Sequence, residues 1–241
     1  MIAVLGDTES VDAAGRVLGS GLRDQGESVA LGAFGRRPRE ADETDDGLLT
    51  TAGPEITGDD VDDLLVRAEE AVGPLHAVVL VLAGQSAMTA GDLAGLDPTH
   101  WRQSVEVPLE QTLACFQGAY RRLRTRGGGL VVLVPSLALV GAPGFVPWAT
   151  VAEGQRSLAK TAARAWGHEG ITVNCVAVPG SLLRRPGEDL PDRAGQPPPS
   201  LGRSPGLRLD VAPVVSSLVS GGWATVTGAT VAVDGGVWMT P

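Results

Sequence analysis

Residues 170–180 read GITVNCVAVPG, and residues 226–236 read VTGATVAVDGG. Each stretch contains a short apolar run of β type, at 172–177 and at 230–233. Five more runs of this kind lie toward the N-terminus, at residues 2–5, 28–32, 48–51, 77–82 and 130–134. The chain therefore predicts about seven strands.

Helical segments separate these runs. Between residues 61 and 72 the apolar side chains fall on one helix face, namely Val61, Leu64, Leu65, Ala68 and Val72. Thr57 and Asp60 offer this helix an N-terminal cap. Strands that alternate with helices favour a parallel sheet covered on both sides. We therefore expect the α/β class, as a single doubly wound domain over residues 1–241 with about seven parallel strands and helices on both faces.

The stretch 181–205 interrupts the alternation. It contains six prolines and several arginines, so regular secondary structure is not expected there. Two interpretations stay open for this Pro/Arg-rich loop: it covers a substrate, or it is a disordered excursion on the surface.

Composition limits the classes of partner. The chain has 241 residues, of which 43% are hydrophobic, so it can bury a large core. Its formal net charge of −9 would repel nucleic-acid phosphates and anionic bilayers. No apolar run reaches the roughly 20 residues of a membrane span, and no basic leader precedes the first strand-like run. We expect no nucleic-acid or membrane partner and a cytoplasmic location.

Metal and thiol chemistry have little support in the sequence. Cys115 and Cys175 lie in apolar surroundings, so both are expected to be reduced core residues. His76, His100 and His168 are widely scattered, without a ligand-like spacing. We therefore expect no metal site.

The two quoted stretches resemble the short-chain dehydrogenase/reductase family, and the resemblance covers essentially the full length. Residues 170–180 are similar to that family's sixth strand and the turn after it, and residues 226–236 are similar to its C-terminal strand motif. The resemblance implies a Rossmann-like fold. For an intact member it would also imply an NAD(P)-dependent reductase.

The family's cofactor turn is altered in this chain. Family members bind NAD(P) through a glycine-rich turn after the first strand, where bare backbone meets the diphosphate. The matching residues are Gly6, Asp7, Glu9, Ser10 and Asp12, of which Ser10 and Asp12 replace the later glycines. A carboxylate ~5 Å from a phosphate charge would cost roughly 3 kcal/mol at an effective dielectric of ~20. We therefore expect the acids to replace the cofactor's anion, so that no cofactor binds; the alternative is an ordinary acidic cap that tolerates a nucleotide.

The family's catalytic positions also hold other residues. Aligned on the loop at 141–144, the resemblance places the family's Asn, Ser, Tyr and Lys at Pro108, Pro135, Trp148 and Ala152. An indole N–H donates a hydrogen bond but does not act as an acid, and the other three side chains carry no polar group. We therefore expect these positions to be vestigial.

Two polar residues near these positions are candidates for other chemistry. A shift by one residue makes Ser136 the serine equivalent, but its partners would then be Ala149 and Glu153, which does not restore the set. Glu153 is a candidate general base if its pocket is dry, because desolvation raises the pKa of a carboxyl group.

These substitutions lead us to expect a non-redox protein. The first hypothesis is a non-catalytic subunit or binding protein, a pseudo-reductase that pairs with itself or with an active relative. The alternative is a cofactor-independent cyclase, dehydratase or isomerase acting on an apolar, polyketide-like metabolite. An atypical NAD(P)-dependent reductase is the residual alternative. Because family members pair through two long helices, the resemblance implies a homo- or hetero-oligomer formed through residues 101–122 and 147–167.

Overall fold

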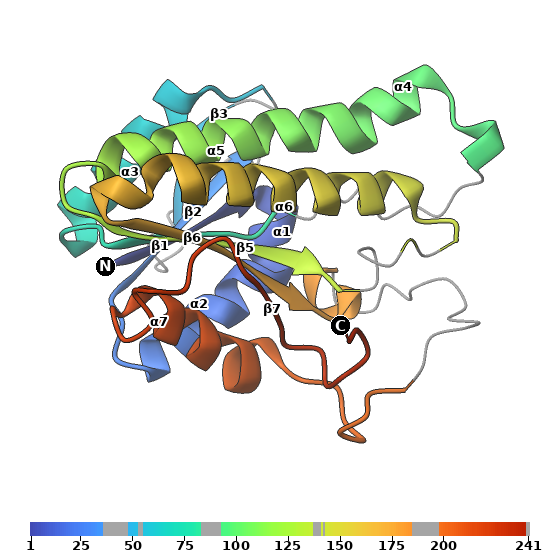
Figure 1. Ribbon diagram of the computed structural model, residues 1–241. Helices are drawn as coiled ribbons and strands as arrows, with labels where there is room; N and C mark the ends of the chain where they lie inside the picture. Colours follow the sequence, from blue (N-terminus) through green and yellow to red (C-terminus); the bar gives the residue numbers. More distant parts are fainter. Residues whose placement is uncertain are drawn as a thin grey trace.

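Seven parallel strands form one sheet in the order β3-β2-β1-β4-β5-β6-β7, which confirms the expected fold class (Figure 1). The computed structural model describes residues 1–35, 48–52, 55–82, 93–136, 141, 143–184 and 198–239. The strands are β1 (Ile2–Asp7), β2 (Val29–Gly35), β3 (Leu48–Ala52), β4 (Ala77–Leu80), β5 (Gly128–Pro135), β6 (Ile171–Val178) and β7 (Thr230–Ala232). Each expected run therefore became a strand.

The middle of the sheet is buried on both faces, as a parallel sheet between helices requires. All four residues of β4 are buried, and β5 and β6 each expose only one residue partly. Valine and leucine fill these strands, and burying one such side chain contributes roughly 1.5–3 kcal/mol. Cys115 and Cys175 are buried free thiols in this core, as expected.

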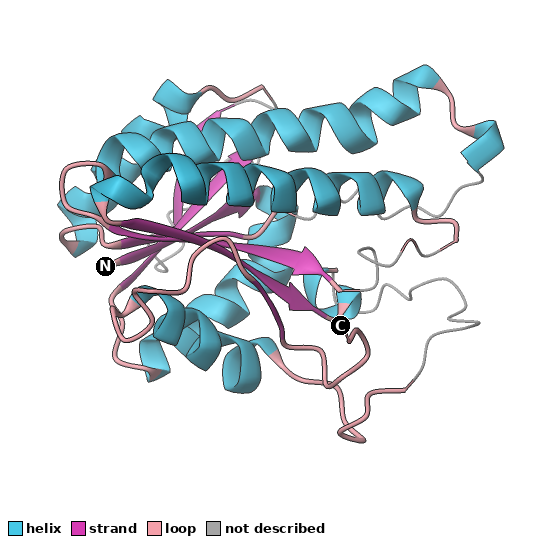
Figure 2. Ribbon diagram, in the orientation of Figure 1, coloured by secondary structure: helices cyan, strands magenta, loops and turns pink. Residues whose placement is uncertain are grey.

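Helices cover the sheet in two layers (Figure 2). One face carries α3 (Gly58–Val72), α5 (Val107–Leu123) and α6 (Val146–Trp166), and the other carries α2 (Arg16–Asp24) and α7 (Ala212–Val219). Shorter helical pieces are α1 (Thr8–Ser10), η1 (Val11–Gly15), η3 (Leu93–Gly95), α4 (Pro98–Trp101), η4 (Arg102–Glu106), η6 (Gly167–Glu169), η7 (Gly180–Leu183) and η8 (Leu207–Val211). Among the described residues, no helix has the length and apolar character needed to cross a bilayer.

The start of α3 follows the sequence expectation. The Thr57 hydroxyl oxygen accepts the Asp60 backbone N–H, and the Asp60 carboxylate accepts the Thr57 N–H in return. This reciprocal pair is a capping box, which satisfies donors that a helix start leaves open. The Thr57 hydroxyl also donates to the Asp60 carboxylate at 2.7 Å, and this bond, together with the one from the Thr57 N–H, holds the pKa of Asp60 below its ordinary value.

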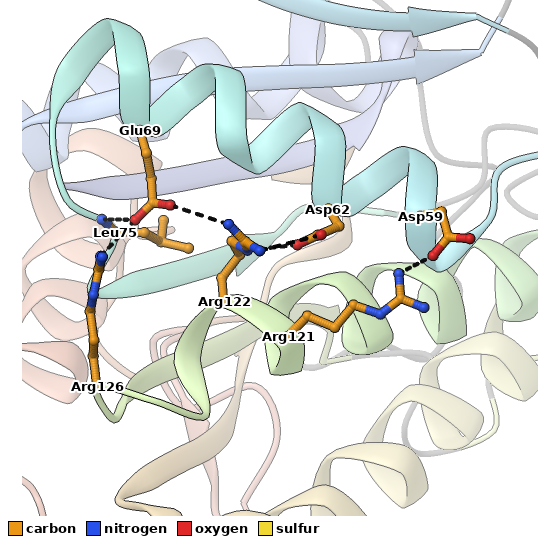
Figure 3. A network of polar contacts seen from close by, with 7 residues as sticks. All are labelled: Asp59, Asp62, Glu69, Leu75, Arg121, Arg122 and Arg126. Atoms are coloured by element: carbon orange, nitrogen blue, oxygen red, sulfur yellow. Dashed lines mark hydrogen bonds and ion pairs between the residues drawn. The ribbon is translucent and has the colours of Figure 1, made fainter.

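A row of ion pairs joins α3 to α5 and to the turn after α5 (Figure 3). Arg122 Nε lies 2.7 Å from Asp62 Oδ1, and Arg126 Nη1 lies 2.9 Å from Glu69 Oε1. Arg121 pairs with Asp59 at the other end of the row. Glu69 also accepts the Leu75 N–H at 3.0 Å, so the row continues into the turn before β4. We call this set of pairs the α3–α5 seam.

The Pro/Arg-rich stretch is described only at its two ends. Residues 185–197 lie outside the described residues. At its far end Leu201 N–H donates to the Gly235 carbonyl and Ser200 Oγ donates to the Gly236 carbonyl. The Asp234 carboxylate accepts the N–H groups of Gly236, Val237 and Trp238, so the C-terminal turn holds this end of the stretch.

Candidate active site

The strand order fixes where a ligand can lie. The chain runs outward from β1 to β2 and β3, then returns to β4 on the other side of β1. In open α/β sheets of this kind, ligands bind outside the carboxyl ends of the strands at such a reversal. The predicted positions Asp7, Pro135 and Ser136 all lie at this edge, with the turn after β6 beside them.

Gly6 keeps the ends of β1 and β4 close together. A Cβ atom added at Gly6 would lie 2.2 Å from the carbonyl oxygen of Val81, which is shorter than any tolerable contact. The Val81 N–H donates to the Leu5 carbonyl at 2.7 Å, so the same two segments are also hydrogen-bonded. Any side chain at this position would push the two strand ends apart.

Asp7 caps the helix that follows β1. One carboxylate oxygen accepts the Ser10 N–H at 2.9 Å, and the other accepts the Ser10 hydroxyl at 2.8 Å. Burial raises the pKa of Asp7, while the hydrogen bonds from Ser10 act in the opposite direction. The helix then continues without a break through η1 into α2, because Val11 donates to Thr8 and Arg16 donates to Val11.

The other two acids of this turn are placed differently. Asp12 is exposed and its carboxylate lies 3.1 Å from Arg16 Nε, one turn further along the helix. Glu9 is half-buried. Of the three carboxylates that the sequence grouped, Asp7 accepts the Ser10 N–H in the first helical turn, whereas Asp12 pairs with Arg16 on the exposed side.

Trp148 fills the space beside the turn after β6. Its side chain is 1% exposed, and a Cβ atom on Gly180 would lie 2.3 Å from the indole ring. Phe145 packs on it with ring centroids 5.9 Å apart. The indole N–H is buried without a hydrogen-bond partner among the described residues. An unpaired buried donor is costly, so this N–H marks a place where a ligand oxygen would be stabilised.

Pro135 and Ser136 end β5 beside β6. The Ser136 N–H donates to the Val178 carbonyl at 2.8 Å, and the residue is 1% exposed. Ala152 is fully buried, one helical turn after Trp148. The structure therefore brings Pro135, Ser136, Trp148 and Ala152 to one edge of the sheet.

Pro108 belongs to a buried polar network that sequence reasoning missed. Its carbonyl accepts the Thr112 hydroxyl at 2.8 Å, and Gln155 Nε2 donates both to Thr112 Oγ1 at 3.2 Å and to the Leu82 carbonyl at 3.0 Å. Pro108 follows the π-type turn η4 as the second residue of α5, where its missing N–H is tolerated. One signal was available: Gln155 lies seven residues after Trp148, on the apolar face of α6.

Glu153 does not lie in a dry pocket. Its side chain is 51% exposed and its carboxylate lies 2.7 Å from Arg156 Nη1. Arg156 in turn donates to Thr230 Oγ1 and lies over the Trp238 ring. The expectation of a dry pocket around Glu153 is therefore wrong, because both solvent and the Arg156 guanidinium reach its carboxylate.

Among the described residues, potential metal ligands do not gather at this edge. Across the described part of the chain, no group of three or more His, Cys, Asp or Glu side chains is placed to hold a metal ion. The three histidines remain apart: His76 lies 3.4 Å from Glu27, and His168 lies 3.5 Å from Glu169.

The comparisons with known proteins agree with the fold. The family model described as Enoyl-(Acyl carrier protein) reductase matches residues 21–238. The chain is 27% identical over 187 residues to the 3-oxoacyl-[acyl-carrier-protein] reductase FabG of Staphylococcus epidermidis, covering 76% of this chain and 74% of that one. It is 33% identical over 187 residues to the cis-4-hydroxycyclohexanecarboxylate dehydrogenase of Sinomonas cyclohexanicum, covering 74% and 72%.

A solved structure shows the same architecture at low identity. The crystal structure of the acetoin dehydrogenase YohF from Salmonella typhimurium superimposes with a TM-score of 0.73 and 19% identity, covering all of this chain and 98% of the other. At this identity the likeness supports the fold alone.

These findings correct the functional expectation from the sequence. We expected a non-redox subunit or binding protein, or else a cofactor-independent cyclase, dehydratase or isomerase. The relatives above are named as reductases and dehydrogenases, which contradicts both expectations. With a family model matched over residues 21–238 and a relative at 33% identity, the chain belongs to the short-chain dehydrogenase/reductase family.

Proposed function

We propose that the protein is an NAD(P)-dependent oxidoreductase that interconverts a hydroxyl and a carbonyl group on a largely apolar substrate. One observation carries this proposal: over about three quarters of its length the chain matches relatives that are named for reduction or dehydrogenation. The strand order also reverses between β1 and β4, which is where open α/β sheets of this kind bind their ligands.

Two features of the crevice fit a nicotinamide nucleotide, and one opposes it. Gly6 leaves bare backbone at the end of β1, where a Cβ would collide with Val81. The Trp148 N–H is buried without a partner among the described residues, so an oxygen of the nucleotide or the substrate would satisfy it once a movement of the surrounding side chains exposed it. The Asp7 carboxylate opposes the fit, because it already holds the Ser10 N–H. When bound, the nucleotide would supply or accept the hydride.

The chain would provide little acid catalysis for this reaction. We propose that the family's Asn, Ser, Tyr and Lys positions are held by Pro108, Pro135, Trp148 and Ala152, so the usual acid is missing. Trp148 could donate a hydrogen bond to a carbonyl oxygen but could not transfer a proton to it. Ser136, which directly follows Pro135 in the sequence, carries the hydroxyl group closest to these positions along the chain. Losing an acid catalyst costs about 10²- to 10⁴-fold in rate, so we expect slow turnover.

The assembly and location belong to the same proposal. We propose that residues 1–241 act as one domain, in the cytoplasm, and that copies pair through α5 and α6. Leu113 on α5 is 46% exposed, which favours a partner there. Leu109 packs closely on Gly154 of α6, so the two helices would act as one surface.

The proposed function can be tested by introducing a Tyr and a Lys at the two positions where the family carries them. Trp148→Tyr combined with Ala152→Lys should raise NADPH-dependent reduction of a 3-oxoacyl thioester by about 10²-fold, because a Tyr with a lowered pKa is an acid. Trp148→Phe combined with Ala152→Lys is the matched control, since it lacks the hydroxyl. Nucleotide oxidation is followed by absorbance for the wild type and for both variants. No detectable oxidation by the wild type with acyl, cyclic and short ketone substrates would overturn the proposed function.

A further inference from the structure

The turn after β1 places one acid against the donors that a diphosphate would use. Asp7 Oδ1 accepts the Ser10 N–H at 2.9 Å and Asp7 Oδ2 accepts the Ser10 hydroxyl at 2.8 Å. Asp12 instead faces Arg16 on the exposed side of the helix. Asp7 and Asp12 are therefore placed differently, and of these two acids Asp7 is the one whose charge lies at the helix start.

These donors belong to a long helix. The segment from Thr8 through Asp24 is continuous, so its first N–H groups carry the positive end of the helix dipole. Such N–H groups are where phosphate binds in nucleotide folds. A single N–H cannot serve two anions, so Asp7 and a diphosphate would compete for it.

The position of Asp7 also makes the ionised form of its carboxyl group energetically unfavourable. Asp7 is partly buried, and the desolvation of its carboxyl group is the largest effect on its pKa, which it raises. The hydrogen bonds from Ser10 offset part of that cost. A second anion placed beside Asp7 would add repulsion in the same poorly solvated surroundings.

We infer that Asp7 is a built-in competitor of the nucleotide diphosphate, and that its carboxylate must release the Ser10 N–H before a dinucleotide can bind. This inference rests on the proposed function and adds what sets the affinity of the protein for the dinucleotide. Two unit charges ~5 Å apart at an effective dielectric of ~20 correspond to about a hundredfold in affinity, so removing the charge should tighten binding by at least about tenfold.

The test is calorimetric titration of NADPH and of NADH into the wild type, Asp7→Asn, Asp7→Ala and Asp12→Asn. Asp7→Asn removes the charge but keeps an oxygen that accepts the Ser10 N–H. Asp7→Ala also frees that N–H, so it should bind more tightly still. Asp12→Asn is the matched control, expected to stay within about twofold of the wild type because its charge faces Arg16. Thermal unfolding without ligand checks each fold, and Asp7→Asn decides the result if Asp7→Ala is unstable.

The outcomes separate the inference from the proposed function. Equal affinities in the wild type and Asp7→Asn would overturn the inference and leave the function standing. Binding by the Asp7 variants alone would support the inference and overturn the function. Equal tightening by Asp12→Asn would overturn the inference, because any acid of the turn would then act alike. Absence of binding in all four proteins would overturn both.

Discussion

Helix α5 takes part in two polar regions that are built in opposite ways. At its N-terminal end, Thr112 joins Gln155 and the Leu82 carbonyl in a neutral, buried network beside the site. At its C-terminal end, Arg121 and Arg122, together with Arg126 in the turn after the helix, form ion pairs with acids of α3 (Figure 3). Buried neutral groups are costly to leave unpaired, whereas exposed ion pairs contribute little. The site edge should therefore be far more sensitive to substitution than the α3–α5 seam.

The largest effect is expected at Gly6. Gly6→Ala places a methyl group 2.2 Å from the Val81 carbonyl oxygen, and backbone cannot rotate away as a side chain can. We expect a loss of about 3 kcal/mol or more in the free energy of unfolding, measured in urea. Gly95→Ala is the control, because nothing lies within 4 Å of its added Cβ. A similar small change in both variants would contradict the close approach of β1 and β4.

The buried network should be the next most sensitive feature. Gln155→Leu leaves the Leu82 carbonyl and the Thr112 hydroxyl without their donor, which should cost about 2 kcal/mol. Thr112→Val, measured alone and together with Gln155→Leu, completes a double-mutant cycle of unfolding free energies. A coupling above ~0.5 kcal/mol is expected, and purely additive losses would show that the two side chains act independently.

The seam should respond weakly and with a gradient along its length. Arg122→Met removes contacts to Asp62 and Glu69, which are 20% and 19% exposed, and should cost about 1 kcal/mol. Arg121→Met should cost less than ~0.5 kcal/mol, since its partner Asp59 is 81% exposed. Both losses should shrink in 1 M salt, because screening acts on exposed charges. A loss at Arg122 as large as that at Gln155 would break the contrast between the two regions.

The smallest effect concerns the surface pair of Arg203 and Asp210. The Arg203 guanidinium, together with the Gly206 N–H, lowers the pKa of Asp210 from 3.8 to about 2. A lowered pKa means that the stabilisation is complete above about pH 4 and is lost as the pH falls through about 2. Asp210→Asn should therefore lower the Tm by about 1 °C at pH 7 and by nothing measurable at pH 2. A difference that persists at pH 2 would assign the effect to packing rather than charge.

Much of the fold could be predicted because its signals are local. The apolar runs of β5 and β6 and the helical period of α3 depend only on neighbours in the chain, as does the capping pair of Thr57 and Asp60. The strand content and the covering of both faces follow from these patterns. The family resemblance, and not a local pattern, assigned Trp148 and Ala152 to the family's Tyr and Lys positions, without showing what they touch.

The functional expectation failed for a different reason. It treated substituted positions as proof of lost chemistry, although residue identity at four positions does not exclude a slower route to the same reaction. The relatives named for redox chemistry cover about three quarters of the chain, and they carry information that these positions alone did not.

The sequence by itself determined the parallel sheet, its two helical layers and the glycine at the end of β1, because periodicity and chain order act over short distances. Only the tertiary structure decided that Asp7 holds the Ser10 N–H while Asp12 turns outward, and that Gln155 meets Leu82 across 73 positions of sequence. A hydrophobic pattern specifies which face of an element is buried. Which buried donor then meets which acceptor depends on how the packed elements are set against one another, and no local pattern encodes that.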